Sequence, residues 1–336
     1  MSLTPFPARL VALLLTGLLS CLGCRCAQAQ SCSTSTSNGN LGTTSSFSLQ
    51  STPSRAQVGG GLSCAGLATL LATSYIRATL TAQTSLTGTG GAAGFSVPFT
   101  VYTDSGYTSA MSIGQFANLN NAPFLGLGSS SASIPLYLGT NLGANVPAGT
   151  YNGSVTINWQ YAVCVTGVGP ACVWARSPGL TQTCILGLAC SAPTDWGSGS
   201  PTQIMVTLVV TKSCLIDNAP NVDFGTQAFV ANFSAVTQNV TVHCTITEGY
   251  TLAFDMGDHP AAPWRQLQSG SNVIRYNIYY PGTTTVWNTA NPQALTGLGG
   301  APVAGQAIGY QAVIDPGQTS PPAGTYTDNV RVIVSY

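Results

Sequence analysis

The sequence predicts an all-β protein made of two antiparallel β-sandwich domains, and three observations lead to this prediction. Short runs of alternating apolar and polar residues are separated by turns rich in Gly, Pro, Asn and Asp along the 336-residue chain. The blocks of Ala, Glu, Lys and Leu that favour long helices are missing, whereas β-branched residues are frequent. The motif Ala-Gly-Thr-Tyr at residues 148–151 recurs at residues 323–326, which indicates that one domain is duplicated.

The duplication extends beyond this motif. In each copy a Ser-Cys pair precedes an apolar residue followed by Gly, a second Cys follows, and a Val and a Tyr come after the Ala-Gly-Thr-Tyr motif. The corresponding residues are Cys32, Leu41, Gly42, Cys64, Val155 and Tyr161 in the first copy, and Cys214, Phe224, Gly225, Cys244, Val330 and Tyr336 in the second. Residues 99–102 likewise correspond to residues 276–279. We therefore expect domains at residues 30–211 and 212–336.

The amino-terminal 29 residues are typical of an export signal. Arg9 provides the charged region, Leu10 to Leu19 form a short apolar core, and Ala27-Gln28-Ala29 is a small-x-small cleavage site. The apolar run is shorter than the roughly 20 residues of a membrane span, so an anchor helix is the weaker interpretation. A lipoprotein cleavage that leaves Cys21 acylated is a further alternative.

The composition and the scarcity of acid–base residues exclude several classes of function. Only 5% of residues are charged and the net charge is zero, whereas nucleic acids require basic clusters. His243 and His259 are the only histidines, and His243 is expected on the solvent face of its strand. Asp255, Asp258 and His259 lie close together, but turn formation accounts for them without a metal. We expect no nucleic-acid partner, no enzyme activity, no cofactor and no metal site.

Eight cysteines follow the expected cleavage site, and an exported protein is expected to oxidise them to disulfides. Cys32 with Cys64, and Cys214 with Cys244, would each close a loop of about 30 residues. The other four cysteines lie in an insertion at residues 164–200 of the first domain. They are Cys164, Cys172, Cys184 and Cys190, and their pairing is left open.

The pattern as a whole resembles the spore coat protein U domain family, which includes subunits of archaic, Csu-type chaperone-usher pili. The resemblance covers the second domain throughout and the cysteines, central strand and Gly-Thr-Tyr strand of the first. The residues that carry it are Cys214, Phe224-Gly225, Cys244-Thr245, the strand at 275–279 and the run from Gly324 to Val330.

This resemblance implies two immunoglobulin-like, pilin-type β-sandwich domains, of which the carboxy-terminal one lacks its final strand. In the family a periplasmic chaperone supplies that strand first, and an adjacent pilin subunit supplies it after assembly at the outer-membrane usher. Independently, the sequence stops at Tyr336 within an alternating strand, which would leave an open edge. The strand-acceptor groove is therefore expected at Val330, Val332, Val334 and Tyr336.

Two further observations favour a tip position in the pilus. Cys32 stands three residues into the expected mature chain, which leaves no extension to donate as a strand. A β-rich run at residues 203–211 has the length needed to complete the first domain in cis. The chain thus resembles a two-domain tip adhesin that mediates surface attachment and biofilm formation, exported through the periplasm to the cell surface.

The insertion is expected to be a loop-rich excursion held by disulfides, with apolar side chains displayed for attachment. The candidate adhesive residues are Trp174, Leu186 and Trp196 in the insertion and Phe124, Leu125 and Leu127 in a separate segment. A glycan receptor and an abiotic hydrophobic surface are both compatible with these residues, as is local packing under the disulfides. The alternative function is a stand-alone secreted or lipid-anchored coat protein with two closed β-domains.

Overall fold

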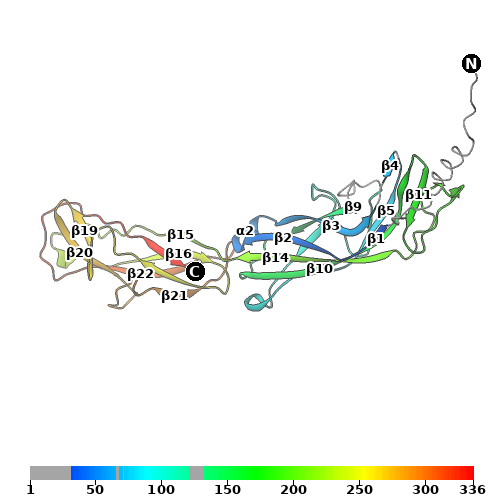
Figure 1. Cartoon of the computed structure of the whole chain (residues 1–336). Coiled ribbons are helices and arrows are strands. Elements are labelled where there is room, and N and C mark those ends of the chain that lie inside the picture. Colours follow the sequence, from blue (N-terminus) through cyan, green and yellow to red (C-terminus); the bar gives the residue numbers. More distant parts are fainter. Residues whose placement is uncertain (1–31, 66–67, 71, 121–131) are drawn as a thin grey trace, which may run out of the picture.

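The computed structural model describes residues 32–336 apart from residues 66–67, 71 and 121–131. Figure 1 shows an elongated molecule in which two β-domains stand end to end, with α2 (Ser46–Ser51) at their boundary. One hydrophobic core lies within residues 41–210 and a separate core within residues 230–314. The predicted all-β, two-domain fold is confirmed. The expected export signal and the candidate residues Phe124, Leu125 and Leu127 lie outside the described residues.

The first domain is a sandwich of a four-stranded sheet, in the order β1-β3-β9-β7, and a larger sheet built around β10. Apolar residues from both sheets alternate inward and form one core. Its elements are β1 (Cys32–Thr34), β2 (Ser37–Ser45), α2, β3 (Arg55–Cys64), β4 (Ala68–Leu70), β5 (Tyr75–Gly88), the 3₁₀ turn η1 (Gly90–Ala92), β6 (Ser96–Val97), β7 (Phe99–Tyr102), β8 (Phe116–Asn118), β9 (Ala132–Thr140), β10 (Gly149–Val168), β11 (Ala171–Arg176), β12 (Cys184–Ile185), β13 (Ala189–Cys190) and β14 (Ser200–Thr211).

The last strand of the first domain, β14, completes the larger sheet from within the same chain. It runs antiparallel to β10 on one side and parallel to β2 on the other. Its inward side chains are almost fully buried, and they are Ile204, Val206, Leu208 and Val210. The strand begins at Ser200, three residues before the expected start at residue 203, because its ladder with β10 extends to the pair of Ser200 with Trp159.

The insertion differs from the expected loop-rich excursion, because it extends the sheet. β10 continues to Val168, β11 folds back on it, and β13 and β12 add further short pairings. Residues 161–165 are buried on both faces of β10, with Val163 and Val165 in the main core and Cys164 bonded to Cys172 of β11. Burial on both faces and a cross-strand disulfide make a rigid strand the favoured conformation here.

The second domain also consists of two sheets, but none of its strands takes the place that β14 has in the first domain. One sheet has the order β15-β16-β22-β20-β19-β18 and the other has the order β21-β17-β23. Its elements are β15 (Cys214–Asn218), the 3₁₀ turn η2 (Val230–Asn232), β16 (Val236–Cys244), β17 (Gly249–Phe254), β18 (Pro260–Ala261), β19 (Trp264–Ser269), β20 (Asn272–Tyr279), β21 (Gln293–Thr296), β22 (Gln306–Ile314) and β23 (Val332–Ser335).

Direct contacts join the two domains at their boundary. The Ser46 hydroxyl at the start of α2 lies 2.6 Å from the Thr245 hydroxyl, and both residues are buried. The Asn145 amide donates to the Leu298 carbonyl at 3.5 Å. A short connection, Lys212 and Ser213, leads from β14 directly into β15. These contacts restrict bending between the domains.

Candidate functional site

The second domain contains a long open groove between β23 and the segment at residues 219–228. Its volume is about 850 Å³. The floor consists of core side chains, namely Phe254, Leu267, Ile274, Tyr276, Ile278, Tyr310, Ala312 and Ile314. An apolar floor beneath two unpaired backbone segments has the shape and chemistry of a site for one added β-strand.

The groove occupies the place that β14 fills in the first domain. β23 corresponds to β10, and within the described part of the chain it pairs only with β17. The segment at residues 219–228 corresponds to β2 and follows β15, but it makes no ladder to another strand in this part. Both walls therefore present free backbone groups to the groove.

The four residues named from the sequence occupy different positions relative to the groove. Val330 and Val332 line it, and Val334 packs against the core below it. Tyr336 is 58% exposed and is not among the lining residues. Sequence reasoning missed the opposite wall, which includes Val222 and Phe224; the repeated Phe224-Gly225 pair was the available signal.

A tyrosine corner and a glycine turn fix the two walls of the groove, and both also occur at the matching places of the first domain. The Tyr151 hydroxyl donates to the Pro147 carbonyl and the Tyr326 hydroxyl donates to the Pro322 carbonyl, each at 2.7 Å. This tyrosine corner pins the start of β10 and its counterpart.

The glycine turn lies in the opposite wall. The amide of Gly42 donates to the Asn40 side chain, and the amide of Gly225 donates to the Asp223 side chain, both at 2.8 Å. Both glycines have positive φ, which a residue with a side chain rarely adopts. The repeated sequence motifs thus encode the same two turns in each domain.

A polar cluster closes one end of the groove where β23 begins. Asp328 accepts a 2.7 Å hydrogen bond from the Tyr276 hydroxyl, and burial followed by this bond raises the pKa of Tyr276. Arg331 pairs with Asp255 at 3.1 Å and with Asp258 at 3.3 Å. Although burial opposes its ionisation, hydrogen bonds from Arg331 and Gly257 lower the pKa of Asp255. These carboxylates anchor a strand.

The two histidines also lie close to other groups of the second domain. His259 Nδ1 lies 3.5 Å from an oxygen of Asp328. His243, expected to face solvent, is half-buried because it contacts Asp217 and its Nε2 lies 2.7 Å from the Val303 carbonyl oxygen. In the described residues, no group of His, Cys, Asp and Glu has the arrangement of a metal site.

Four disulfides link the eight cysteines of the described residues. Cys32 is bonded to Cys64 and Cys214 to Cys244, each joining the first strand of a domain to its neighbour. In the insertion, Cys164 is bonded to Cys172 and Cys184 to Cys190. The insertion is therefore divided into two small covalent loops.

The Cys184–Cys190 loop is a hairpin with an apolar tip. Leu186 is 93% exposed and Ile185 is 72% exposed, and Leu188 also faces solvent. Leu186 has φ +53° and is followed by Gly187 at φ +73°, so a leucine occupies a turn position that favours Gly, Asn or Asp. Leu186 is therefore exposed in a backbone conformation that costs free energy and that its side chain does not offset by packing.

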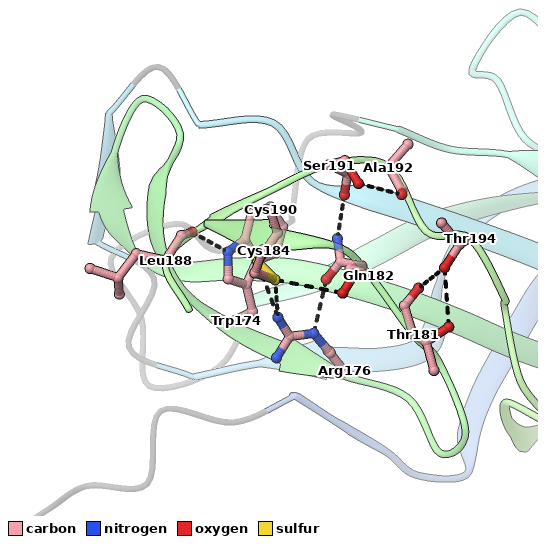
Figure 2. The surroundings of a disulfide bond; sticks show 10 residues. All are labelled: Trp174, Arg176, Thr181, Gln182, Cys184, Leu188, Cys190, Ser191, Ala192 and Thr194. Atoms are coloured by element: carbon pink, nitrogen blue, oxygen red, sulfur yellow. Dashed lines mark hydrogen bonds between the residues drawn. A yellow bond between two sulfur atoms is a disulfide. The ribbon is translucent and has the colours of Figure 1, made fainter. Parts of the chain in front are cut away.

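Side chains beneath the hairpin hold it in place, as Figure 2 shows. The Trp174 indole donates to the Leu188 carbonyl at 2.9 Å. The Arg176 guanidinium donates to the Gln182 side chain at 2.9 Å and lies 3.4 and 3.3 Å from the sulfurs of Cys184 and Cys190. The hairpin is thus supported at its neck and free at its tip.

The candidate adhesive residues in the insertion therefore have unequal exposure. Leu186 projects fully, whereas Trp174 stacks on Tyr75 and Trp196 covers Arg77, so both are half-buried. Further exposed apolar residues of this end, outside the six candidates, are Val168, Val173, Ile185 and Leu188. Figure 1 places β11 and β4 at the end of the molecule farthest from the second domain.

Comparison with family models identifies the chain. The spore coat protein U domain model matches residues 18–158 and 201–333. The chain belongs to this family. The two matched regions leave out residues 159–200, which contain the whole insertion at residues 164–200. The resemblance noted in the sequence is confirmed for both domains.

A solved structure of a pilus subunit has the same fold. The CsuC–CsuE chaperone–tip adhesion subunit pre-assembly complex from archaic chaperone-usher Csu pili of Acinetobacter baumannii contains a chain with 24% identity and a TM-score of 0.61, over 91% of this chain and 100% of that one. The CfaE adhesive subunit of the CFA/I fimbria of enterotoxigenic Escherichia coli has 10% identity and a TM-score of 0.30, over 89% and 92% of the two chains. No curated protein matches. Among the described residues, no helix has the length and hydropathy to cross a membrane.

Proposed function

We propose that this protein is the tip adhesin of a chaperone-usher pilus. The observation that carries the proposal is the difference between the domains: β14 fills the first groove, and the matching groove of the second is open. A molecule with one open groove attaches through that domain and presents the other. The structure of the Csu chaperone–tip adhesion subunit complex supports this proposal through its common fold.

In this function a periplasmic chaperone fills the groove first, and an adjacent pilin subunit replaces the chaperone strand at the outer-membrane usher. The protein would then stand at the end of a fibre on the cell surface. The apolar hairpin at residues 184–190 would contact the surface to be colonised and promote biofilm formation. The role is attachment rather than catalysis.

The assembly part is tested by co-expression of the chain with the chaperone of its own pilus system. We expect a stable one-to-one complex, and we expect the chain alone to aggregate or to be degraded. Replacement of the floor residue Ile278 by Asp would abolish the complex. A stable, monomeric chain that gains nothing from the chaperone would instead favour a stand-alone coat protein.

The adhesive part is tested with Leu186→Asn. Asn tolerates the left-handed conformation, so the turn and the fold are kept while the exposed apolar side chain is lost. We expect piliated cells to lose most of their attachment to a hydrophobic surface. The matched control is Leu298→Asn, an exposed leucine near the domain boundary. Equal attachment by cells carrying either variant would contradict an adhesive role for the hairpin.

A further inference from the structure

A row of polar side chains crosses the outer face of the large sheet of the first domain. Arg77 on β5 is paired in register with Asn118 on β8 and with Gln160 on β10. Directly paired residues of neighbouring strands point to the same face of a sheet. We call Arg77, Asn118 and Gln160 the arginine row.

Two aromatic rings hold the central guanidinium of the arginine row. The Arg77 Cζ lies 3.9 Å from the ring centre of Phe116 and 4.1 Å from that of Trp196. Phe116 comes from β8, two residues before Asn118, and is 53% exposed. Trp196 comes from the insertion. Stacking between two rings fixes the plane of the guanidinium and leaves its edge as the direction for hydrogen bonding.

Among the described residues, the Arg77 guanidinium has aromatic neighbours but no anionic or hydrogen-bonding partner. It makes no hydrogen bond or ion pair to a described residue, and its Nε is buried without a hydrogen-bond acceptor. The two carboxylates of the described first domain have other partners: Asp104 accepts from Thr108 and Ser109, and Asp195 accepts from the amide of Gly197. A partly desolvated cation with an unmet acceptor requirement is suited to an anionic ligand.

We propose that the arginine row binds a carboxylate carried on a sugar ring, as in a polysaccharide of uronic acids. The fork of a planar guanidinium matches the two oxygens of a carboxylate. The Gln160 side-chain nitrogen already donates to the Gly197 carbonyl at 2.7 Å, which orients the amide and leaves its oxygen for a hydroxyl. Asn118 offers a second amide, and the exposed part of Phe116 offers an apolar face to the ring.

The surroundings favour this ligand over other anions. One arginine in a nearly uncharged surface cannot hold a polyphosphate or a nucleic acid, which need several cations. A neutral glycan would leave the charge unpaired. The proposal rests on the proposed adhesive function, for which it names the class of receptor, and it places this receptor beside the apolar hairpin rather than on it.

The test uses the full chain in its complex with the chaperone, and titration calorimetry with a hexamer of galacturonic acid. The same hexamer with its carboxyl groups reduced to alcohols is the neutral probe. We expect the acidic hexamer to bind at least 10-fold more tightly than the neutral one. Arg77→Met should lower this affinity by about 10- to 100-fold, the loss of one bidentate charged contact. Arg77→Lys, which keeps the charge and loses the fork, should lower it by a smaller factor.

Arg55→Met is the matched control, because Arg55 also stacks on an aromatic ring, that of Tyr107 at 4.3 Å. It should leave the affinity within 2-fold, and the chaperone alone should not bind. Equal affinity for the acidic and neutral hexamers, or unchanged affinity in both Arg77 variants, would overturn the proposal. Full displacement by equimolar inorganic sulfate would also overturn it, because the sugar would then contribute nothing. The measurement does not need an assembled pilus. A negative binding result would therefore overturn the carbohydrate site without counting against the proposed position at the pilus tip.

Discussion

The two domains carry the same sequence motifs, but the strand that completes the first domain has no counterpart in the second. Val155 in the first domain is fully buried, whereas its counterpart Val330 is half-buried at the groove; Tyr161 is 5% exposed and its counterpart Tyr336 is 58% exposed. For the valines the difference lies in one neighbour, because Val155 pairs with Ile204 of β14 and no described strand covers that side of β23. The same sequence pattern therefore gives a closed core or an open one according to whether one strand is present.

The largest effect is expected from supplying that strand. A copy of residues 200–211 fused after Tyr336 through a short Gly/Ser linker should fill the groove with four or five apolar side chains. Their burial sets an upper bound of about 8 to 15 kcal/mol on the gain in unfolding free energy of the second domain. Chemical denaturation measures this gain. A fused strand whose inward residues are Ser is the control, and an equal gain from it would show that the groove does not accept a strand.

A smaller effect on stability is expected when each of the two equivalent valines, Val155 and Val330, is replaced by Ala. Val155→Ala removes two buried methyl groups and should destabilise the first domain by about 2 to 3 kcal/mol. Val330→Ala should cost less than about 1 kcal/mol in the uncomplemented chain, because its side chain is already half-exposed. Urea unfolding curves of the two variants give the comparison. In the chain with the fused strand the two costs should converge, and a persistent difference would mean that the groove stays open.

The smallest effect on stability is expected from the tyrosine corner of the first domain. Burial, with a contribution from the charge of Glu248, raises the pKa of Tyr151 to about 12. The folded state favours the protonated phenol, so this contribution to stability is complete below the unfolded pKa of about 10 and is lost as pH rises toward 12. Tyr151→Phe should remove that part of the alkaline destabilisation between about pH 10 and 12. An unchanged pH dependence of unfolding in this variant would contradict the assignment.

The sequence was sufficient for the features that repeat. The Ala-Gly-Thr-Tyr motifs revealed the duplication, and the β-rich run at residues 203–211 predicted β14. It was insufficient where contacts are non-local. The wall at residues 219–228 has no strand pattern to reveal it, and the sequence has no signal for the indole hydrogen bond from Trp174 to Leu188. Arg77 had no signal at all, because its aromatic partners come from β8 and the insertion.

The position of β14 also has a mechanical consequence. The insertion ends where β14 begins at Ser200, and β14 leads through Lys212 and Ser213 into β15. Traction on the apolar hairpin would therefore travel along one continuous backbone from the far end of the molecule to the second domain. The flanking ladders to β10 and β2 lie parallel to that pull, so they would be sheared together rather than opened one bond at a time. The strand that completes the first domain is thus also its tether.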